Sequence, residues 1–214
     1  MSTPSFQIRV CQNPSCGLRY PLTPDHPFGE RCPLCLGETI AVLEQTIERE
    51  PPREENLFKQ KNLHVMLDNI RSAWNVGSIF RTADGFGFKH LYLCGITPTP
   101  DNEAVTKTSL GAEDFVTWSA HKDAVKLVNG LKKEGFAIWA LEQTDNSESI
   151  DTAINSLKTD QTTVLVVGSE VTGVDPGILE ITDRVVHLSM RGQKRSFNVA
   201  VAFAVAAHTM QGKS

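Results

Sequence analysis

Apolar and polar positions alternate along most of the chain with two different periods. Short apolar runs, which are typical of buried strands, occur at 63–67, 90–95, 137–142, 162–168 and 184–190. Segments of helical period follow them, at 75–85, 103–110, 121–134, 147–157, 176–181 and about 198–211. Strands that alternate with helices predict an α/β fold with a parallel sheet covered on both faces. The last helical segment is apolar nearly all round, so we expect it to be buried or to lie at a subunit interface.

Residues 44–61 differ from this pattern. Charged residues are dense there, and Pro51 and Pro52 interrupt any helix, which is the composition of a linker. The sequence therefore predicts a small segment at 1–43, a charged linker at 44–61 and the main domain at 62–214.

Four of the five cysteines, Cys11, Cys16, Cys32 and Cys35, lie within the small segment. Two cysteine pairs on tight turns predict a four-cysteine zinc ribbon, because so short a segment buries too little surface to fold without a metal. Disulfides or free thiols are the alternative, and His26 is a substitute ligand. The fifth cysteine, Cys94, ends an apolar strand and is predicted to be a buried small side chain.

Composition restricts the function further. The 214 residues contain no apolar run of membrane-spanning length, and the start of the chain lacks the pattern of a signal peptide, so we expect a cytoplasmic protein. A formal net charge of −4 argues against a uniformly basic nucleic-acid clamp but allows a local basic patch.

Ligand sites of parallel sheets gather at the carboxyl ends of the strands. After the strand at 63–67, the sequence NVGSIFR carries Asn75, Gly77 and Arg81. Asn75 is a candidate N-cap on the loop before a helix. Arg81 is either a solvated charge on the helix or a partly buried one that needs an anionic partner, and its apolar neighbours favour the second interpretation.

Two further polar clusters follow strand ends. After 162–168, Gly168 and Gly173 flank Glu170, which predicts a close backbone approach to a ligand beside a carboxylate that pairs with Arg81. After 184–190, a cationic loop leads into Ser196 and Asn198. These two side chains either cap the last helix or line a polar pocket beside an RNA-phosphate patch. The loop cations are Arg191, Lys194 and Arg195.

Together the segments NVGSIFR, GSEVTG and LSMRGQKRSFNV resemble the three motifs of the SpoU (TrmH-type) RNA ribose 2′-O-methyltransferases of the SPOUT class. The resemblance covers about residues 62–212. Two positions depart from the family pattern: Ser189 replaces a proline and Phe197 replaces a leucine. Both affect the shape of the pocket and neither removes a polar group.

The resemblance implies a fold, a cofactor and a dimer. The carboxyl-terminal part would form a trefoil knot through which two protomers pack. S-adenosylmethionine would lie bent in the knot, with its adenine held by backbone of Leu141, Gly168, Leu188 and Phe197 and with Ser196 close by.

The resemblance also implies catalytic roles. Arg81 would lie beside the attacking ribose hydroxyl, and because an arginine side chain keeps its proton at neutral pH and is a poor base, we expect electrostatic stabilisation instead. Glu170 would hold Arg81, and Asn75 would orient Arg81 or the ribose. Ser196 and Asn198 would position the nucleotide, and no metal would take part in the chemistry.

The substrate is RNA rather than DNA, because only RNA offers a 2′-hydroxyl. The resemblance implies that this RNA is tRNA or rRNA. The zinc segment would either contact RNA phosphates through Arg9, Arg19 and Arg31 or serve as a dimer strut or accessory. Three other functions compete: a catalytically silent RNA-binding factor, a methyltransferase acting on a base nitrogen, and a nucleotide-binding switch. The switch ranks last, since the chain lacks a phosphate-binding G-x-x-x-x-G-K-[ST] loop.

Overall fold

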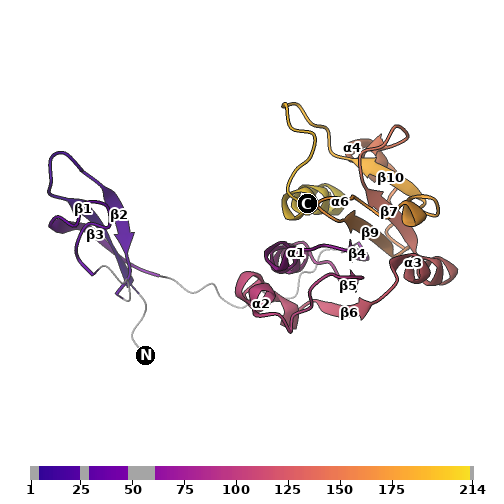
Figure 1. Cartoon of the computed structure of the whole chain (residues 1–214), viewed down its shortest axis with the longest axis horizontal. Coiled ribbons are helices and arrows are strands. Elements are labelled where there is room, and N and C mark those ends of the chain that lie inside the picture. Colours follow the sequence, from indigo (N-terminus) through magenta and orange to yellow (C-terminus); the bar gives the residue numbers. More distant parts are fainter. Residues whose placement is uncertain (1–4, 25–28, 48–60, 213–214) are drawn as a thin grey trace. The chain divides into compact units, whose positions relative to one another are not determined.

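The computed structural model describes residues 5–24, 29–47 and 61–212 (Figure 1). The chain divides into two compact units, an amino-terminal unit at 1–57 and a carboxyl-terminal unit at 58–214. Most of the predicted linker, with Pro51 and Pro52, lies outside the described residues. Within the described ranges, no helix combines the length and apolar character needed to cross a bilayer.

The amino-terminal unit is a small antiparallel sheet with strand order β2-β1-β3. Its strands are β1 (Ser5–Cys11), β2 (Arg19–Leu22) and β3 (Thr39–Thr46). Cys11 ends β1, Cys16 lies on the turn before β2, and Cys32 and Cys35 lie on the turn before β3. Nearly every side chain of β3 is exposed, so the apolar core of this unit is small.

The carboxyl-terminal unit is built on a seven-stranded sheet with the order β6-β5-β4-β9-β7-β10-β8. All of its paired strands run parallel, which confirms the predicted class of sheet. The strands are β4 (Leu63–Asp68), β5 (His90–Cys94), β6 (Thr117–His121), β7 (Ala137–Leu141), β8 (Glu148–Ser149), β9 (Thr163–Gly168) and β10 (Arg184–His187). The trefoil knot stays a prediction.

Helices cover both faces of this sheet (Figure 1). One buried cluster joins β4 and β9 to α1, α4 and α6, and a second joins the opposite face to α3 and α5. Cys94 is fully buried in the second cluster, as predicted. The helices are α1 (Ala73–Gly85), α2 (Glu103–Ser109), α3 (Ala124–Lys133), α4 (Ile150–Ala153), α5 (Pro176–Leu179) and α6 (Val199–Gln211), with 3-10 turns η1 (Ala112–Asp114) and η2 (Ile154–Ser156).

The predicted elements were wrong at two edges of the sheet. The strand β6 was missed, because an edge strand exposes much of its surface and the sequence TWSAH has no continuous apolar run. The helix expected at 147–157 is instead the two-residue strand β8, the short helix α4 and the turn η2. In addition, α3 begins after 121, because the Asp123 side chain accepts a hydrogen bond from the Lys126 N–H and caps the helix.

Candidate functional site

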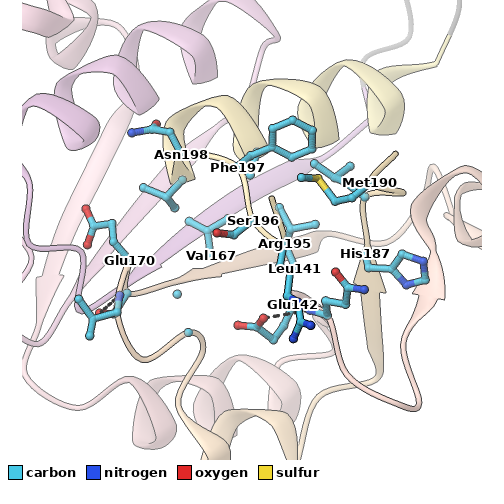
Figure 2. Close-up of a pocket in the computed structure, with 18 residues that line it drawn as sticks. Leu141, Glu142, Val167, Glu170, His187, Met190, Arg195, Ser196, Phe197 and Asn198 are labelled. Atoms are coloured by element: carbon cyan, nitrogen blue, oxygen red, sulfur yellow. Dashed lines mark hydrogen bonds between the residues drawn. The ribbon is translucent and has the colours of Figure 1, made fainter. Parts of the chain in front are cut away.

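A cavity of about 500 Å³ opens at the carboxyl ends of β7, β9 and β10 (Figure 2). This volume lies within the range of small-molecule sites. The loop that leads into α6 forms another wall. All five residues that the resemblance assigns to the cofactor line this cavity: Leu141, Gly168, Leu188, Ser196 and Phe197.

The loop of the second motif folds back on itself. Ser169 and Gly173 form an antiparallel bridge, and the Gly173 N–H donates to the Ser169 carbonyl at 2.9 Å. A Cβ atom on Gly168 would lie 2.2 Å from the Gly173 carbonyl carbon, and Gly173 has a φ of +73°. Gly168 therefore lets backbone meet backbone within the loop, and Gly173 supplies the left-handed conformation of the turn. Both glycines thus shape the loop itself, besides the ligand approach that the sequence suggested.

Asn75 links all three motifs through its side-chain amide. Its Nδ2 donates to Glu170 Oε1 at 2.9 Å, and its Oδ1 accepts from Asn198 Nδ2 at 3.1 Å. The Asn198 Oδ1 in turn accepts from the Ala200 N–H at 2.9 Å, which makes Asn198 the N-cap of α6. The Glu170 carboxylate can only accept, so it faces the Asn75 Nδ2, and the Ala200 N–H can only donate, so it faces the Asn198 Oδ1. Both ends of this chain therefore agree with the Asn198-to-Asn75 hydrogen bond in the middle.

The prediction that Asn75 caps its helix was wrong. Ser72 is the N-cap of α1, and its side chain accepts from the Asn75 N–H at 3.3 Å. Asn75 therefore lies inside the first helical turn. Its side chain is free to bond Glu170 and Asn198 for that reason.

Glu170 is a hydrogen-bond acceptor for the start of α1. Its carboxylate accepts from the Arg71 N–H at 3.1 Å and the Ser72 N–H at 3.4 Å, besides the Asn75 amide. Burial by itself would raise the pKa of Glu170, but these hydrogen bonds outweigh it and lower that pKa below its usual value. Glu170 is therefore ionised at neutral pH and is a weak base.

Arg81 lies apart from this network, which corrects two expectations. Its side chain is exposed rather than partly buried, and it forms no ion pair with Glu170 or with any other described residue. Asn75 and Arg81 are six residues apart on one helix, so they lie on different faces of α1 and do not meet. The guanidinium of Arg81 thus faces solvent, where a phosphate can reach it.

Gly77 of the first motif has a packing function. A Cβ atom there would lie 2.4 Å from the Val105 carbonyl oxygen and 2.7 Å from the Thr108 Cβ. Only a glycine lets α1 approach α2 this closely.

The loop of the third motif presents an exposed cationic surface next to the cavity. Arg191, Lys194 and Arg195 are exposed, and none of them forms an ion pair with a residue that the structure describes. Arg195 also lines the cavity, as does Ser196, which is exposed and does not cap α6. The local basic patch that the net charge allows is therefore present at the mouth of the site.

Sequence reasoning missed Glu142, which also lines the cavity. Its Oε2 accepts from the Val174 N–H at 3.1 Å and its Oε1 accepts from the Gln143 N–H at 2.9 Å. Glu142 directly follows β7, so the rule that sites gather at strand ends could have found it if it had been applied to this strand.

The four cysteines of the amino-terminal unit converge as the zinc prediction requires. Their sulfur atoms all lie within 4.8 Å of one another, with Cys11 and Cys35 at 3.4 Å and Cys16 and Cys32 at 3.7 Å. A tetrahedral ion with zinc–sulfur bonds of about 2.3 Å separates its thiolates by about 3.8 Å, whereas a disulfide needs about 2.05 Å. The cysteines are free thiols that fit one zinc ion, and His26 lies outside the described residues.

One of the three arginines expected to contact RNA phosphates cannot do so. Arg9 is only 5% exposed, and its guanidinium donates to the Thr39 hydroxyl and carbonyl and to Gln7 Oε1 at 2.8–2.9 Å. Its charge is also near the carboxylate of Glu30, at 3.5 Å. Arg19 and Arg31 are exposed, as that expectation requires.

Comparisons with known proteins match most of the carboxyl-terminal unit to one family. Residues 62–208 match the SpoU rRNA Methylase family. The tRNA (guanosine(18)-2'-O)-methyltransferase of Aquifex aeolicus (strain VF5) is 31% identical over 175 residues, which cover 79% of this chain and 77% of that protein. The 23S rRNA (guanosine(2553)-2'-O)-methyltransferase RlmP of Bacillus subtilis (strain 168) is 26% identical over 159 residues, 74% of this chain and 61% of that protein.

A solved structure shows the same fold. The crystal structure of the A. aeolicus TrmH/SpoU tRNA modifying enzyme has a TM-score of 0.62 and 31% identity, over 71% of this chain and 75% of that one. The matched region contains all three motifs and excludes the cysteine-bearing segment. The chain therefore belongs to the SpoU rRNA methylase family.

Proposed function

We propose that the protein transfers a methyl group from S-adenosylmethionine to a ribose 2′-hydroxyl of tRNA or rRNA in the cytoplasm. The observation that carries this proposal is the cavity at the ends of β7, β9 and β10, which adjoins the hydrogen-bonded chain from Glu170 through Asn75 to Asn198. Relatives named for methylating tRNA and 23S rRNA support both classes of substrate.

The cavity fits the methyl donor. Backbone at Leu141, Gly168, Leu188 and Phe197 would bind the adenine, with Ser196 beside it. When bound, S-adenosylmethionine supplies the methyl carbon, which passes to the ribose oxygen as its bond to sulfur breaks. The proton of the hydroxyl leaves to solvent.

Arg81 would act on the RNA. Its solvent-facing guanidinium would bind the phosphate next to the target ribose and stabilise the negative charge that develops on the attacking oxygen. Glu170 supports this role indirectly, because it ties the start of α1 to the second motif through Arg71 N–H, Ser72 N–H and Asn75. The cations of the third-motif loop would hold neighbouring phosphates.

A homodimer is part of the proposal. One surface of α6 leaves apolar side chains in solvent: Phe197, immediately before the helix, is 43% exposed, and Val201 and Val205 are 48% and 43% exposed. Val201 and Val205 are four residues apart, so they lie on one face of the helix. A second copy of the carboxyl-terminal unit would cover this face, consistent with the interface predicted for the apolar last helix.

The test is incubation of the purified protein with isotope-labelled S-adenosylmethionine and unmodified bulk RNA, then digestion and mass spectrometry of the nucleosides. A labelled 2′-O-methyl nucleoside is expected. Label on a base would favour base methylation, and donor binding without any label would favour a catalytically silent RNA-binding factor.

Replacing the proposed catalytic arginine makes this test specific. Arg81→Ala should lower the transfer rate at least about 100-fold while donor affinity changes less than about 2-fold, because Arg81 does not line the cavity. Lys133→Ala, which removes an exposed cation from the end of α3, is the matched control and should leave the rate unchanged. Substantial turnover by Arg81→Ala would remove this residue from the mechanism.

A further inference from the structure

Glu142 is a half-buried carboxylate in the wall of the cavity for which the three motifs provide no role. We propose that its carboxylate binds the ribose hydroxyls of the adenosine part of S-adenosylmethionine. This inference rests on the proposed function, because it takes the same cavity to be the site of the methyl donor.

The Glu142 side chain is held in place from two sides. The Gln143 N–H and the Val174 N–H donate to its two oxygens, one from the loop after β7 and one from the end of the second-motif loop. A Cβ atom on Gly173 would lie 2.3 Å from Oε2, so the carboxylate also packs directly on that glycine. An ionised carboxylate offers about four acceptor positions, and these contacts use two of them.

The charge of Glu142 has no cationic partner in the described part of the chain, where no lysine, arginine or histidine nitrogen lies within 4 Å of it. A partly buried carboxylate of this kind is stabilised by further hydrogen-bond donors. The methyl donor brings two vicinal hydroxyls, and its sulfonium adds a positive charge. The second carboxylate of the cavity, Glu170, is already occupied by three donors.

The place of Glu142 along the cavity favours the ribose. It directly follows Leu141, whose backbone is proposed to bind the adenine, whereas Glu170 lies with Asn75 and Asn198 at the proposed reacting end. Figure 2 shows the two carboxylates at different places along the cavity, with Val167 and Ser196 between them in this view. The ribose joins adenine to sulfur, so it must lie between these ends. An acidic side chain after a strand that accepts from ribose hydroxyls is also the solution used by dinucleotide-binding α/β folds.

The experiment is calorimetric titration with S-adenosylhomocysteine and with its 2′-deoxy and 3′-deoxy analogues. Glu142→Gln keeps the size of the side chain and removes its charge. It should weaken binding of S-adenosylhomocysteine about 10-fold, because a hydrogen bond to a charged group is lost. The same variant should weaken binding of at least one deoxy analogue by less than about 2-fold, because the hydroxyl that Glu142 binds is already absent.

Comparison of the three ligands separates a direct contact from a structural one. If Glu142 only ties the two loops together, Glu142→Gln will weaken all three ligands equally, and that result overturns the inference. Asp145→Asn, an exposed carboxylate on the same loop, is the matched control and should change none of the affinities. Glu142→Asp keeps the charge and replaces Glu142→Gln in the experiment if the latter does not fold. The Asp variant should still bind S-adenosylhomocysteine more tightly than its deoxy analogues.

Failure of the proposed function has a different signature. A wild-type protein that binds S-adenosylhomocysteine no better than adenine alone would refute the donor site itself. A wild-type protein that binds it well but loses no affinity when either hydroxyl is removed would refute only the role of Glu142.

Discussion

Large apolar side chains have opposite environments in the two units of the chain. Ile40 and Leu43 on β3 of the amino-terminal unit are 49% and 47% exposed, whereas Ile79 on α1 and Phe203 on α6 of the carboxyl-terminal unit are fully buried. The buried side chains of the amino-terminal unit are few, and two of them are the cysteines Cys11 and Cys32. One unit is therefore organised around a cluster of four thiols that fits a zinc ion, and the other around an apolar core.

The largest expected effect is the loss of zinc from the amino-terminal unit. Cys32→Ser should reduce the zinc content from about one ion per chain to near zero and unfold this unit, because structural zinc contributes about 10–16 kcal/mol in small domains. The measurement is metal analysis together with amide NMR signals of β1 to β3. Cys94→Ala removes the fifth cysteine, which lies in the carboxyl-terminal core, and should leave the zinc content unchanged. Persistence of the β1–β3 signals without metal would show that the fold of this unit does not depend on zinc.

The next effect is on the apolar core. Phe203 packs edge-on against Phe88 with ring centroids 5.2 Å apart, so Phe203→Ala should lower the free energy of unfolding of the carboxyl-terminal unit by about 3–5 kcal/mol. Urea unfolding followed by tryptophan fluorescence reports this unit alone, because Trp74, Trp118 and Trp139 all lie in it. Leu43→Ala is the matched substitution in the other unit and should leave the fluorescence transition unchanged. A loss below about 1 kcal/mol for Phe203→Ala would mean that α6 does not close the core.

The smallest expected effect is on the acid stability of the carboxyl-terminal unit. His64, His90 and His121 lie on three adjacent strands, and His64 Nδ1 is 3.1 Å from the Tyr92 hydroxyl. Burial, with a contribution from His90, lowers the pKa of His64 to about 4, and burial with the neighbouring His121 lowers the pKa of His90. The folded state therefore favours neutral rings.

The sign of the pH dependence follows from these pKa shifts. As the pH falls below about 6.5, the unfolded chain binds protons that the folded chain does not, so the free energy of unfolding should decrease down to about pH 4. It should be independent of these groups above about pH 7. The fluorescence transition measured across this range checks the effect, and His64→Gln should reduce the slope. An unchanged slope in that variant would show that other groups cause the acid sensitivity.

Much of the site could be predicted from the sequence. The three motifs identified the strand ends that build the cavity, and the cysteine spacing predicted the cluster of four thiols, because both depend on residue type at fixed short spacing. The hydrogen-bond partners of Glu170 could not be predicted in this way, and the expected pairing with Arg81 was wrong. It was inferred from charge alone, whereas backbone N–H groups of Arg71 and Ser72 and the amide of Asn75 satisfy Glu170 instead.

The roles of the glycines also required the structure. The sequence marked Gly168 and Gly173 as positions of close approach, and Gly77 only as a small residue of the first motif, but did not show what lies beside each of them. In the folded chain the neighbours are the Val105 carbonyl, the backbone of the same loop, and the Glu142 carboxylate. Likewise, Arg9 was expected to be exposed and to contact RNA phosphates, but its side chain is buried in the folded sheet.

The class of the sheet, the family, the cluster of four cysteines and several residues that line the cavity could be predicted from the sequence alone. These follow from periodicity and from motifs, which are local properties of the chain. The tertiary structure decided which polar groups satisfy one another, because residues 95 to 123 positions apart, such as Glu170, Asn75 and Asn198, meet only when the ends of separate strands and helices are brought together. It also decided that Arg81 faces solvent and that Glu142 faces the cavity, since the exposure of a side chain depends on the elements that pack around it.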